Sequence, residues 1–389
     1  MKIIFTGGGT AGHAMVNTVL IPYLQAKECK TVYIGSKNGM EKEMVKKLPE
    51  VPYYGINTGK FRRYASLKNI TDICRIASGI LEALKIIKKE KPQLIYSSGG
   101  YVSVPVVWAA NILKIPVVIR ETDYSPGLAN KLCMPFAKEM FITFPDTAKG
   151  IKNICCIDEG MIIRPELFNE SQFSTTFINM RKPVCLIIGG SSGASNINNT
   201  IWDNVDMLCQ RYSIIHICGK GKTNSDIVDT DSYQQIEYVD DIGMFYNIAD
   251  VVITRSGSNS IIEGLLLGKR MICVPLSSHV SRGEQLLNAQ FAEKNGTAVI
   301  VEDEQFNVGN LMRAIDAVLS QKAQPLYQLT KTKLEKQIKK HVDSIYNLAF
   351  AQLKKDIHSY IKHGNKLNLN DLSSWETDIY EEYASNYEV

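Results

Sequence analysis

The chain has 389 residues, of which 45% are hydrophobic and 22% are charged, and these proportions exclude general disorder. A chain of this length exceeds what one hydrophobic core usually serves, so we expect two domains. The 44 basic and 40 acidic residues leave a net charge of +4, which is too small to indicate nucleic-acid binding. We therefore predict no nucleic-acid partner.

The chain shows no secretory signal pattern, because an apolar strand pattern begins at residue 2. No apolar stretch is long enough to cross a bilayer. The nine cysteines have no paired metal-binding spacing, and several lie in apolar runs, which favours reduced thiols in a protein core. We expect a soluble or peripheral protein of the cytoplasm.

Strand and helix patterns alternate through the first half of the chain. We expect strands at 2–6, 31–34, 94–96 and 116–119 and helices at 14–26, 66–90 and 105–113. This alternation is typical of an α/β fold with parallel strands and crossover helices, in which ligands bind at the carboxyl ends of the strands.

The pattern breaks near residues 157–165 and resumes with strands expected at 184–188, 213–217, 236–238, 251–254 and 271–274. Lysine-rich helices are expected from 311 to 355, and an acidic, polar segment follows residue 364. We therefore divide the chain into a domain at 1–164, a second domain at 165–345 and a C-terminal segment at 346–389 whose role is unassigned.

A glycine-rich turn follows the first strand of each half. One is Gly-Gly-Gly-Thr-Ala-Gly-His at 7–13, and the other is Gly-Gly-Ser-Ser-Gly at 189–193. Glycine permits a sharp bend, and the helix that follows points its N–H groups and its positive end at a bound phosphate. Two such turns predict two nucleotide-binding folds that face one cleft.

His13 follows the first turn, at the start of the expected helix. The positive helix end disfavours the imidazolium form, so the ring is suited to accept a proton near neutral pH. We predict a catalytic base, with a hydrogen bond to the turn backbone as the structural alternative.

The spacing of Gly7, Gly9 and Gly12 also matches a dinucleotide-binding turn. An NAD site needs an acidic residue at the end of the second strand to hold the ribose, and this strand ends in Ile-Gly-Ser-Lys at 34–37. The missing acid disfavours an NAD-dependent enzyme, which stays as a remote alternative.

Four further polar segments follow expected strands, at 98–103, 120–123, 255–260 and 281–288. Glu263, in the helix after the third segment, is suited to the two hydroxyls of a ribose, and the amides of the fourth are suited to sugar hydroxyls. Each segment alone is equally consistent with a capped helix start. Together they predict a nucleotide-sugar site.

The order of these motifs resembles that of the MurG family, GT-B glycosyltransferases of the family 28 type, over about residues 1–345. The matching motifs are GGTAGH at 8–13, GGYVS at 99–103, PGLAN at 126–130, GGS at 189–191, RSG at 255–257 and Gln285 with Asn288 and Ala289. The resemblance implies two Rossmann-like domains with parallel sheets around a cleft. It also implies inverting transfer of N-acetylglucosamine from UDP-N-acetylglucosamine to undecaprenyl-linked lipid I, giving lipid II for peptidoglycan, with no cofactor and no metal.

The resemblance further implies roles for individual residues. In the second domain, the donor would be held by Arg164 and the Val239 backbone at the uracil, Glu263 at the ribose, Ser191 at the diphosphate and Gln285 at the N-acetylglucosamine. In the first domain, the sugar would be bordered by Asp123 and by the turn of Thr10, Ala11 and Gly12. The same turn would receive the acceptor diphosphate, and His13 would take the proton from the muramyl 4-hydroxyl.

Three positions depart from the family pattern. Ala11 stands where glycine is common, Arg120 where histidine is common, and Glu284 where some members have glutamine. Arg120 would either pair with an acceptor phosphate or mark a paralogue that glycosylates another lipid-linked or small-molecule acceptor. A non-catalytic sugar-nucleotide-binding protein is a third interpretation.

Residues 60–91 carry nine basic side chains against three acidic ones, interleaved with apolar residues. Anionic headgroups attract such a surface by about 1 kcal/mol per basic residue. We predict that this segment binds an anionic membrane at the cytoplasmic face. The alternative for its apolar residues is packing on the protein's own sheet.

Overall fold

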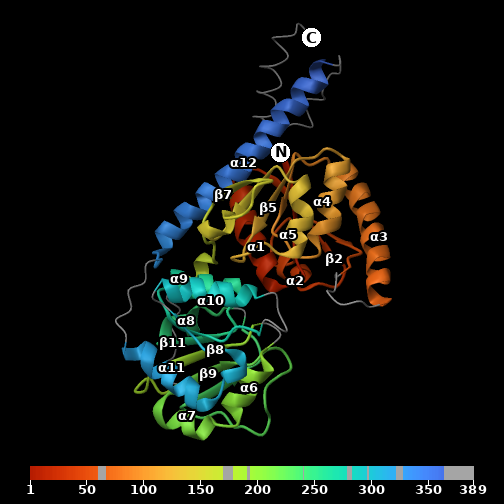
Figure 1. The fold of residues 1–389 in the computed structure, drawn as a ribbon. Coiled ribbons are helices and arrows are strands. Elements are labelled where there is room, and N and C mark those ends of the chain that lie inside the picture. The colour runs from red at the N-terminus through yellow and green to blue at the C-terminus, as the bar shows by residue number, and fades with distance from the viewer. Residues whose placement is uncertain are drawn as a thin grey trace. The chain divides into compact units, whose positions relative to one another are not determined.

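The computed structural model describes residues 1–59, 67–169, 178–190, 193–239, 241–277, 283–295, 298–320 and 327–362, with backbone only at 67–71 and 360–362. The chain divides into two compact units (Figure 1). Unit 1 comprises Met1–Glu121, Pro126–Glu159 and the chain from Gln337 onward, and unit 2 comprises Thr122–Ser125 and Gly160–Lys336.

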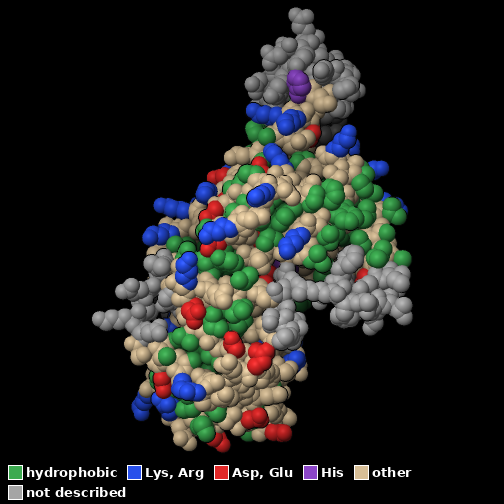
Figure 2. Space-filling model, in the orientation of Figure 1, with side chains coloured by type: hydrophobic (Ala, Val, Ile, Leu, Met, Phe, Trp, Pro, Cys, Tyr) green, Lys and Arg blue, Asp and Glu red, His purple; other side chains and the backbone are tan. Residues whose placement is uncertain are grey.

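Unit 1 contains a parallel seven-stranded sheet of order β3-β2-β1-β4-β5-β6-β7. Its strands are β1 (Lys2–Thr6), β2 (Lys30–Ser36), β3 (Tyr53–Ile56), β4 (Leu94–Ser97), β5 (Val117–Glu121), β6 (Glu139–Ile142) and β7 (Cys155–Asp158). Its helices are α1 (Ala11–Gln25), α2 (Met40–Val45), α3 (Leu67–Glu90), α4 (Ser103–Ile112) and α5 (Leu128–Cys133), with 3₁₀ turns η1 (Met134–Phe136) and η2 (Pro145–Ala148). Figure 2 shows hydrophobic side chains gathered over the surface of α3 and α4.

Unit 2 contains a parallel six-stranded sheet of order β10-β9-β8-β11-β12-β13. Its strands are β8 (Val184–Ile188), β9 (Ser213–Ile217), β10 (Tyr233–Ile236), β11 (Val251–Thr254), β12 (Arg270–Cys273) and β13 (Ala298–Ile300). Its helices are α6 (Ser195–Trp202), α7 (Val205–Arg211), α8 (Gly243–Ile248), α9 (Ser258–Leu266), α10 (Glu284–Lys294), α11 (Val308–Ser320) and the start of α12 (Lys331–Lys362), with 3₁₀ turns η3 (Pro165–Phe168) and η5 (Asp303–Gln305).

Each sheet reverses its strand order at the strand that comes first in its unit's main sequence segment, β1 in unit 1 and β8 in unit 2. β1 lies between β2 and β4, and β8 lies between β9 and β11. In doubly wound sheets ligands bind outside the carboxyl ends of the strands at such a reversal, because the connections there diverge to opposite faces. The turns at 7–9 and 189–190 directly follow β1 and β8, so each lies at the reversal of its own sheet.

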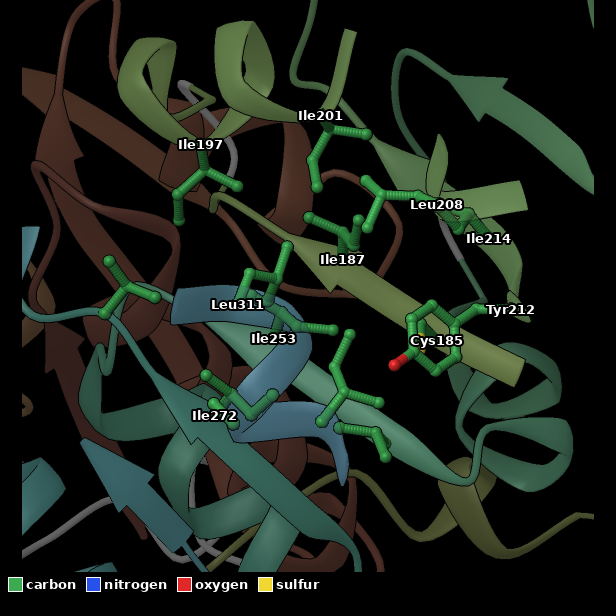
Figure 3. Close-up of a cluster of buried hydrophobic side chains, with 14 of the residues drawn as sticks. Cys185, Ile187, Ile197, Ile201, Leu208, Tyr212, Ile214, Ile253, Ile272 and Leu311 are labelled. Carbon is green, nitrogen blue, oxygen red and sulfur yellow. The ribbon is translucent and has the colours of Figure 1, made fainter. Parts of the chain in front are cut away.

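The central strands are rich in valine and isoleucine and are buried on both faces, as parallel sheets require. In unit 2 the side chains of Ile187 and Ile253 in the sheet pack with Ile197 and Leu311 from helices (Figure 3). Full burial of such a side chain contributes about 1.5–3 kcal/mol. This core fixes the strand ends from which the polar segments emerge.

The strands expected at 2–6, 184–188, 213–217 and 251–254 are confirmed residue for residue. The strand expected at 236–238 is wrong, because β10 spans Tyr233–Ile236 and its pairing with β9 ends at Ile236. The helix expected at 14–26 begins at Ala11 instead. The short strands β3, β6, β7 and β13 were not predicted, because three or four residues carry too little periodicity.

The compact units differ from the predicted domain division at their edges. Residues 122–125 are grouped with unit 2, and unit 2 begins again at Gly160 rather than at Pro165. The chain from Gln337 is grouped with unit 1, although the prediction placed 337–345 in the second domain. The reason is that Ile338, Val342 and Ile345 form one apolar, fully buried stripe of α12.

A buried polar network fixes α12 to unit 1. Arg120 of β5 is 1% exposed, and its Nη2 donates to Thr143 Oγ1 at 3.1 Å. Its Nη1 donates to Nδ1 of the buried His341 at 3.2 Å. Because a guanidinium only donates, the proton of His341 sits on Nε2, which donates to the Tyr96 hydroxyl at 2.9 Å. The expectation that Arg120 pairs with an acceptor phosphate is therefore wrong.

Glu159 completes the network beneath α12. Its Oε1 accepts a hydrogen bond from Ser344 Oγ at 2.7 Å, and its Oε2 lies 3.8 Å from His341 Nδ1. Burial, reinforced by the charge of Arg120, holds the pKa of His341 well below its usual value. The ring is therefore neutral, and its contact with Glu159 is not an ion pair.

Among the helices that the described ranges contain, none combines the length and the apolar character needed to cross a bilayer.

We predict that acidification destabilises the fold through two buried histidines. Burial lowers the pKa of His216 to about 3, and the pKa of His341 is also depressed, whereas an unfolded histidine titrates near about 6.5. Below that pH the unfolded chain binds more protons than the native one. The free energy of unfolding should thus fall on acidification, by up to about 1.4 kcal/mol per pH unit for each histidine.

Thermal melting between pH 7.5 and 5.5 measures this effect. His341→Asn keeps an acceptor for Arg120 and should show a shallower pH dependence than the parent chain. His358→Asn, on the same helix, is the matched control. Equal slopes for the parent and His341→Asn would contradict the assignment.

Candidate functional site

Two glycine turns of unit 1 pack against each other at the carboxyl ends of β1 and β4. Gly8 N donates to Gly99 O at 3.2 Å. A Cβ atom on Gly100 would lie 2.0 Å from the Gly8 oxygen, and one on Gly9 would lie 2.3 Å from the Tyr101 ring. Both glycines also have positive φ, +80° and +87°. Only glycine fits at these two positions, so the close approach of the turns is a property of the sequence.

The first turn leads directly into the N terminus of α1. Thr10 is the N-cap residue and is exposed, and the half-buried Ala11, Gly12 and His13 form the first helical turn. The first N–H groups of a helix have no acceptor within the helix, and the helix end is positive. Thr10, Ala11 and Gly12 thus lie at a helix end suited to an anionic group.

The hydrogen bond of His13 assigns its tautomer. Nδ1 lies 3.1 Å from the carbonyl oxygen of Ser98, in the segment that follows β4. A carbonyl only accepts, so the proton of a neutral His13 ring sits on Nδ1 and the lone pair sits on Nε2. The alternative expected from the sequence is a bond to the backbone of the first turn, whereas the observed partner is Ser98, and this bond places the lone pair on Nε2, where it can accept a proton.

An acidic side chain lies at the end of β2, although the strand itself lacks one. Glu41 of α2 is fully buried, and its Oε1 accepts hydrogen bonds from Ser36 N at 2.9 Å and Ser36 Oγ at 2.5 Å. Gly9 N lies 3.4 Å from Oε2, so both oxygens of this fully buried carboxylate accept from protein donors and neither is placed to bind a ribose. Its position therefore does not revive the NAD interpretation.

The second glycine turn follows β8 and precedes α6. Gly193 N donates to Gly190 O at 2.9 Å, which closes the turn. A Cβ atom on Gly193 would lie 2.2 Å from the Cys218 oxygen, and its φ is +70°. Ser191, the residue expected at the donor diphosphate, lies outside the described residues.

Asp303 accepts hydrogen bonds from both of the segments that follow β8 and β11. Its Oδ1 accepts from Arg255 Nη1 at 2.5 Å and from Asn196 Nδ2 at 2.7 Å. Asn196 belongs to the first turn of α6, and Arg255 opens the segment before α9. Arg255 therefore positions a turn, and no local pattern signals Asp303, because it lies 48 residues further along the chain.

Glu263 of α9 is buried beside Tyr246 and Arg164 in unit 2. Its Oε2 accepts from the Tyr246 hydroxyl at 3.0 Å, and its Oε1 lies 4.0 Å from Arg164 Nη2. Burial raises the pKa of Glu263, and the charge of Arg164 and the Tyr246 hydrogen bond counter that rise. The structure thus brings together two predicted donor residues, Arg164 and Glu263, and adds Tyr246, which sequence reasoning missed.

Asn288 of α10 organises the segment that contains Asp123. The fully buried Asn288 amide accepts from Tyr124 N at 2.9 Å through Oδ1. Its Nδ2 donates to Asp123 Oδ1 at 3.2 Å and to Ser256 O at 3.3 Å. Ser256 has a φ of +61°, a conformation that costs energy for serine and occurs at functional sites. One amide therefore holds two polar segments of unit 2.

Gln285 and Val239 both lie past the carboxyl ends of unit 2 strands, Gln285 near β12 and Val239 after β10. Gln285, in the first turn of α10, accepts from Leu276 N at 2.8 Å through Oε1, which orients its amide after β12. Val239 follows β10 by three residues and is half-buried.

Among the residues that the structure describes, no group of three metal-ligating side chains is found. The absence of a metal stays a prediction.

Family patterns match both halves of the chain. The pattern of the glycosyltransferase family 28 N-terminal domain covers residues 3–142, and that of the C-terminal domain covers residues 184–345. Two solved structures share the fold. One is MurG of Acinetobacter baumannii, with a TM-score of 0.65 at 23% identity over 89% of this chain and 99% of that one. The other is a UDP-GlcNAc 2-epimerase of Methanocaldococcus jannaschii, with a TM-score of 0.63 at 15% identity over 89% and 100%.

Curated relatives are closer in sequence. A Clostridium tetani protein is 45% identical over 79% of this chain and 86% of its own length, and one from Clostridium perfringens is 40% identical over 88% and 97%. Both are named UDP-N-acetylglucosamine--N-acetylmuramyl-(pentapeptide) pyrophosphoryl-undecaprenol N-acetylglucosamine transferase. With matches to both family domains and two parallel-sheet units of GT-B type, this chain belongs to glycosyltransferase family 28.

Proposed function

We propose that this chain transfers N-acetylglucosamine from UDP-N-acetylglucosamine to the muramyl 4-hydroxyl of undecaprenyl-linked lipid I, with inversion, to give lipid II. Relatives at 40–45% identity bear the name of this transferase. The geometric observation that carries the proposal is the Nδ1–H tautomer of His13 beside a helix end suited to a diphosphate. Transfer of labelled sugar to a lipid I analogue tests it, and labelling of another acceptor alone would favour a paralogue.

The donor is assigned to unit 2. Glu263 accepts hydrogen bonds from the ribose hydroxyls, and Arg164 and the Val239 backbone contact the uracil. Gln285 and Asp123 contact the N-acetylglucosamine, with Asn288 fixing Asp123. Ser191 and the N–H groups of its turn meet the diphosphate. The support for Glu263 is that its side chain keeps 9% exposure, with Oε2 held by the Tyr246 hydroxyl and Oε1 4.0 Å from Arg164.

The acceptor is assigned to unit 1, with its diphosphate at Thr10, Ala11 and Gly12. His13 Nε2 takes the proton of the muramyl 4-hydroxyl as that oxygen forms a bond to the anomeric carbon. The bond from the anomeric carbon to the UDP oxygen breaks, and its electron pair leaves with UDP. A neutral imidazole is the form that this step requires, and the Ser98 carbonyl favours the tautomer with its lone pair on Nε2.

The departing UDP gains negative charge. N–H groups fixed at the second glycine turn and at the N terminus of α6 stabilise that charge more in the transition state than in the ground state. We expect no metal or other cofactor, because these groups supply the electrostatic stabilisation.

We further propose that unit 1 binds the cytoplasmic face of the membrane through an apolar–basic face. Its exposed apolar members are Ile73, Leu81, Ile112, Leu128 and Phe136. Its exposed basic members are Arg75, Lys85, Lys88, Lys89 and Lys91. α4 packs between α3 and α5, and Figure 2 shows the hydrophobic side chains gathered there. Lys60, Arg62 and Arg63 lie outside the described residues, as does the Lys68 side chain.

The apolar members of this face favour a membrane over a solvated helix. Leu81 is 62% exposed and Ile112 is 60% exposed, so neither packs on the unit 1 sheet. Basic residues beside exposed leucine and isoleucine are typical of an interfacial surface. The alternative of core packing holds for other positions, because Ile76 and Ile87 of the same helix are buried.

Glu263→Gln should weaken donor binding. The variant loses the charge that strengthens hydrogen bonds from the ribose, worth about 1.5–3 kcal/mol, so KM for UDP-N-acetylglucosamine should rise about 10- to 100-fold with kcat little changed. Steady-state kinetics measures this effect, with Glu293→Gln on the exposed side of α10 as the control. An unchanged donor KM would reject the ribose assignment.

His13→Ala should lower kcat on the order of 10²- to 10⁴-fold, because general base catalysis contributes a factor of this size. Binding of UDP-N-acetylglucosamine, measured by calorimetry, should be unchanged, since the donor is assigned to unit 2. A variant that keeps the parental kcat would show that another group takes the proton.

Charge reversal should release the chain from anionic vesicles. Lys85→Glu with Lys88→Glu changes the charge of the apolar–basic face by four units, and each lost lysine removes about 1 kcal/mol of attraction. Sedimentation with phosphatidylglycerol vesicles measures the loss. Lys333→Glu with Lys336→Glu makes an equal change on the unit 2 part of α12, and equal loss in both variants would argue against a local membrane face.

A further inference from the structure

The acidic side chain nearest the first glycine turn has no place in the scheme above. Glu41 is fully buried, although a charged group is costly to bury without partners. Three donors compensate it: Ser36 N at 2.9 Å and Ser36 Oγ at 2.5 Å on Oε1, and Gly9 N at 3.4 Å on Oε2. One carboxylate therefore connects the end of β2 to the turn that follows β1.

The glycines around Glu41 are shaped to admit it. A Cβ atom on Gly8 would lie 2.5 Å from the Glu41 carboxyl carbon, and one on Gly39 would lie 2.2 Å from Oε1. Two glycines far apart in the sequence thus leave space for one carboxylate. The close packing fixes the position of the first glycine turn relative to the Glu41 carboxylate.

We propose that Glu41 is a positioning residue for the acceptor half of the site. It holds the first glycine turn so that the N terminus of α1 and His13 face the lipid-linked diphosphate acceptor, and this assignment rests on the proposed function. The carboxylate occupies the Gly9 N–H and repels any phosphate from it. The acceptor diphosphate is thereby directed to the N–H groups from Thr10 onward.

Chemistry explains why an amide cannot replace this carboxylate. Both oxygens of Glu41 accept from N–H groups. A glutamine has one carbonyl oxygen, so its NH₂ group would face either Ser36 N or Gly9 N, donor against donor. The turn would then lose one of its two fixed ends, while the size of the side chain would stay the same.

Glu41→Gln should lower kcat/KM for a lipid I analogue on the order of 10- to 100-fold, because a small misplacement of the turn moves His13 and the acceptor diphosphate together relative to the anomeric carbon of the donor. KM for UDP-N-acetylglucosamine should stay within about twofold, since the donor is assigned to unit 2. Glu43→Gln is the matched control, because Glu43 lies on the same helix with an exposed side chain paired with Lys46 at 2.8 Å. A purely structural role for Glu41 would weaken both substrates together.

Ser36→Ala provides a milder variant in case Glu41→Gln does not fold. It removes one donor to the carboxylate, and it should lower the acceptor kcat/KM less than Glu41→Gln while sparing the donor KM. Parental acceptor kinetics in both variants, or equal losses for donor and acceptor, would overturn the proposal.

Amide hydrogen exchange separates this proposal from the proposed function. Exchange at Gly9 should be faster in Glu41→Gln than in Glu43→Gln, whatever the reaction of the chain is. If the parent chain does not glycosylate the lipid I analogue, the proposed function fails, and the exchange of Gly9 still tests the hold of Glu41 on the turn. Unchanged exchange at Gly9 would overturn the positioning role directly.

Discussion

The unit 1 site depends on the close backbone approach of two glycine turns at the reversal of a parallel sheet. The Gly8 oxygen lies where any side chain on Gly100 would begin. Since β1 and β4 are neighbours at the reversal, their following turns must share this space, and only glycine makes the sharing possible. The N terminus of α1 and the ring of His13 take their positions from that contact.

In each unit, buried charged and polar side chains form hydrogen bonds that hold particular loops in place. In unit 1, Arg120 donates to His341 and Thr143, and Glu41 accepts from Ser36 and the Gly9 backbone. In unit 2, Asp303 binds Arg255 and Asn196. Leaving a buried polar group without its partner costs several times what a surface pair contributes. These networks therefore fix loop positions that apolar packing alone would leave loose.

The departures from the family pattern have different physical meanings. Arg120 stands where the resemblance leads one to expect histidine. Its guanidinium donates to His341 of α12, so this side chain is bound inside unit 1. Ala11 lies in the first turn of α1, where a methyl group is compatible with helical backbone. Neither change alters the polar groups assigned to substrates. These two departures are therefore compatible with the proposed reaction, and nothing in the structure explains Glu284.

Local pattern was sufficient for the central strands, both glycine turns and the position of His13 at a helix start. It was sufficient because apolar strand runs and glycine turns depend on residues that are adjacent in the sequence. It failed at β10 and at the unpredicted short strands, because three or four residues carry too little periodicity to set their bounds. The resemblance, rather than pattern, supplied Arg164 and Val239.

Only the tertiary structure could assign the partners of these groups. Glu41 reaches Gly9 across 32 residues, Asn288 reaches Asp123 across 165, and Arg120 reaches His341 across 221. No local periodicity encodes such pairs, because they depend on which strand ends and helix starts the sheet order brings together. The sequence by itself determined where glycine-rich turns and polar segments occur, whereas the fold decided which of their side chains are exposed and which are held by buried partners, because sheet order brings distant residues together.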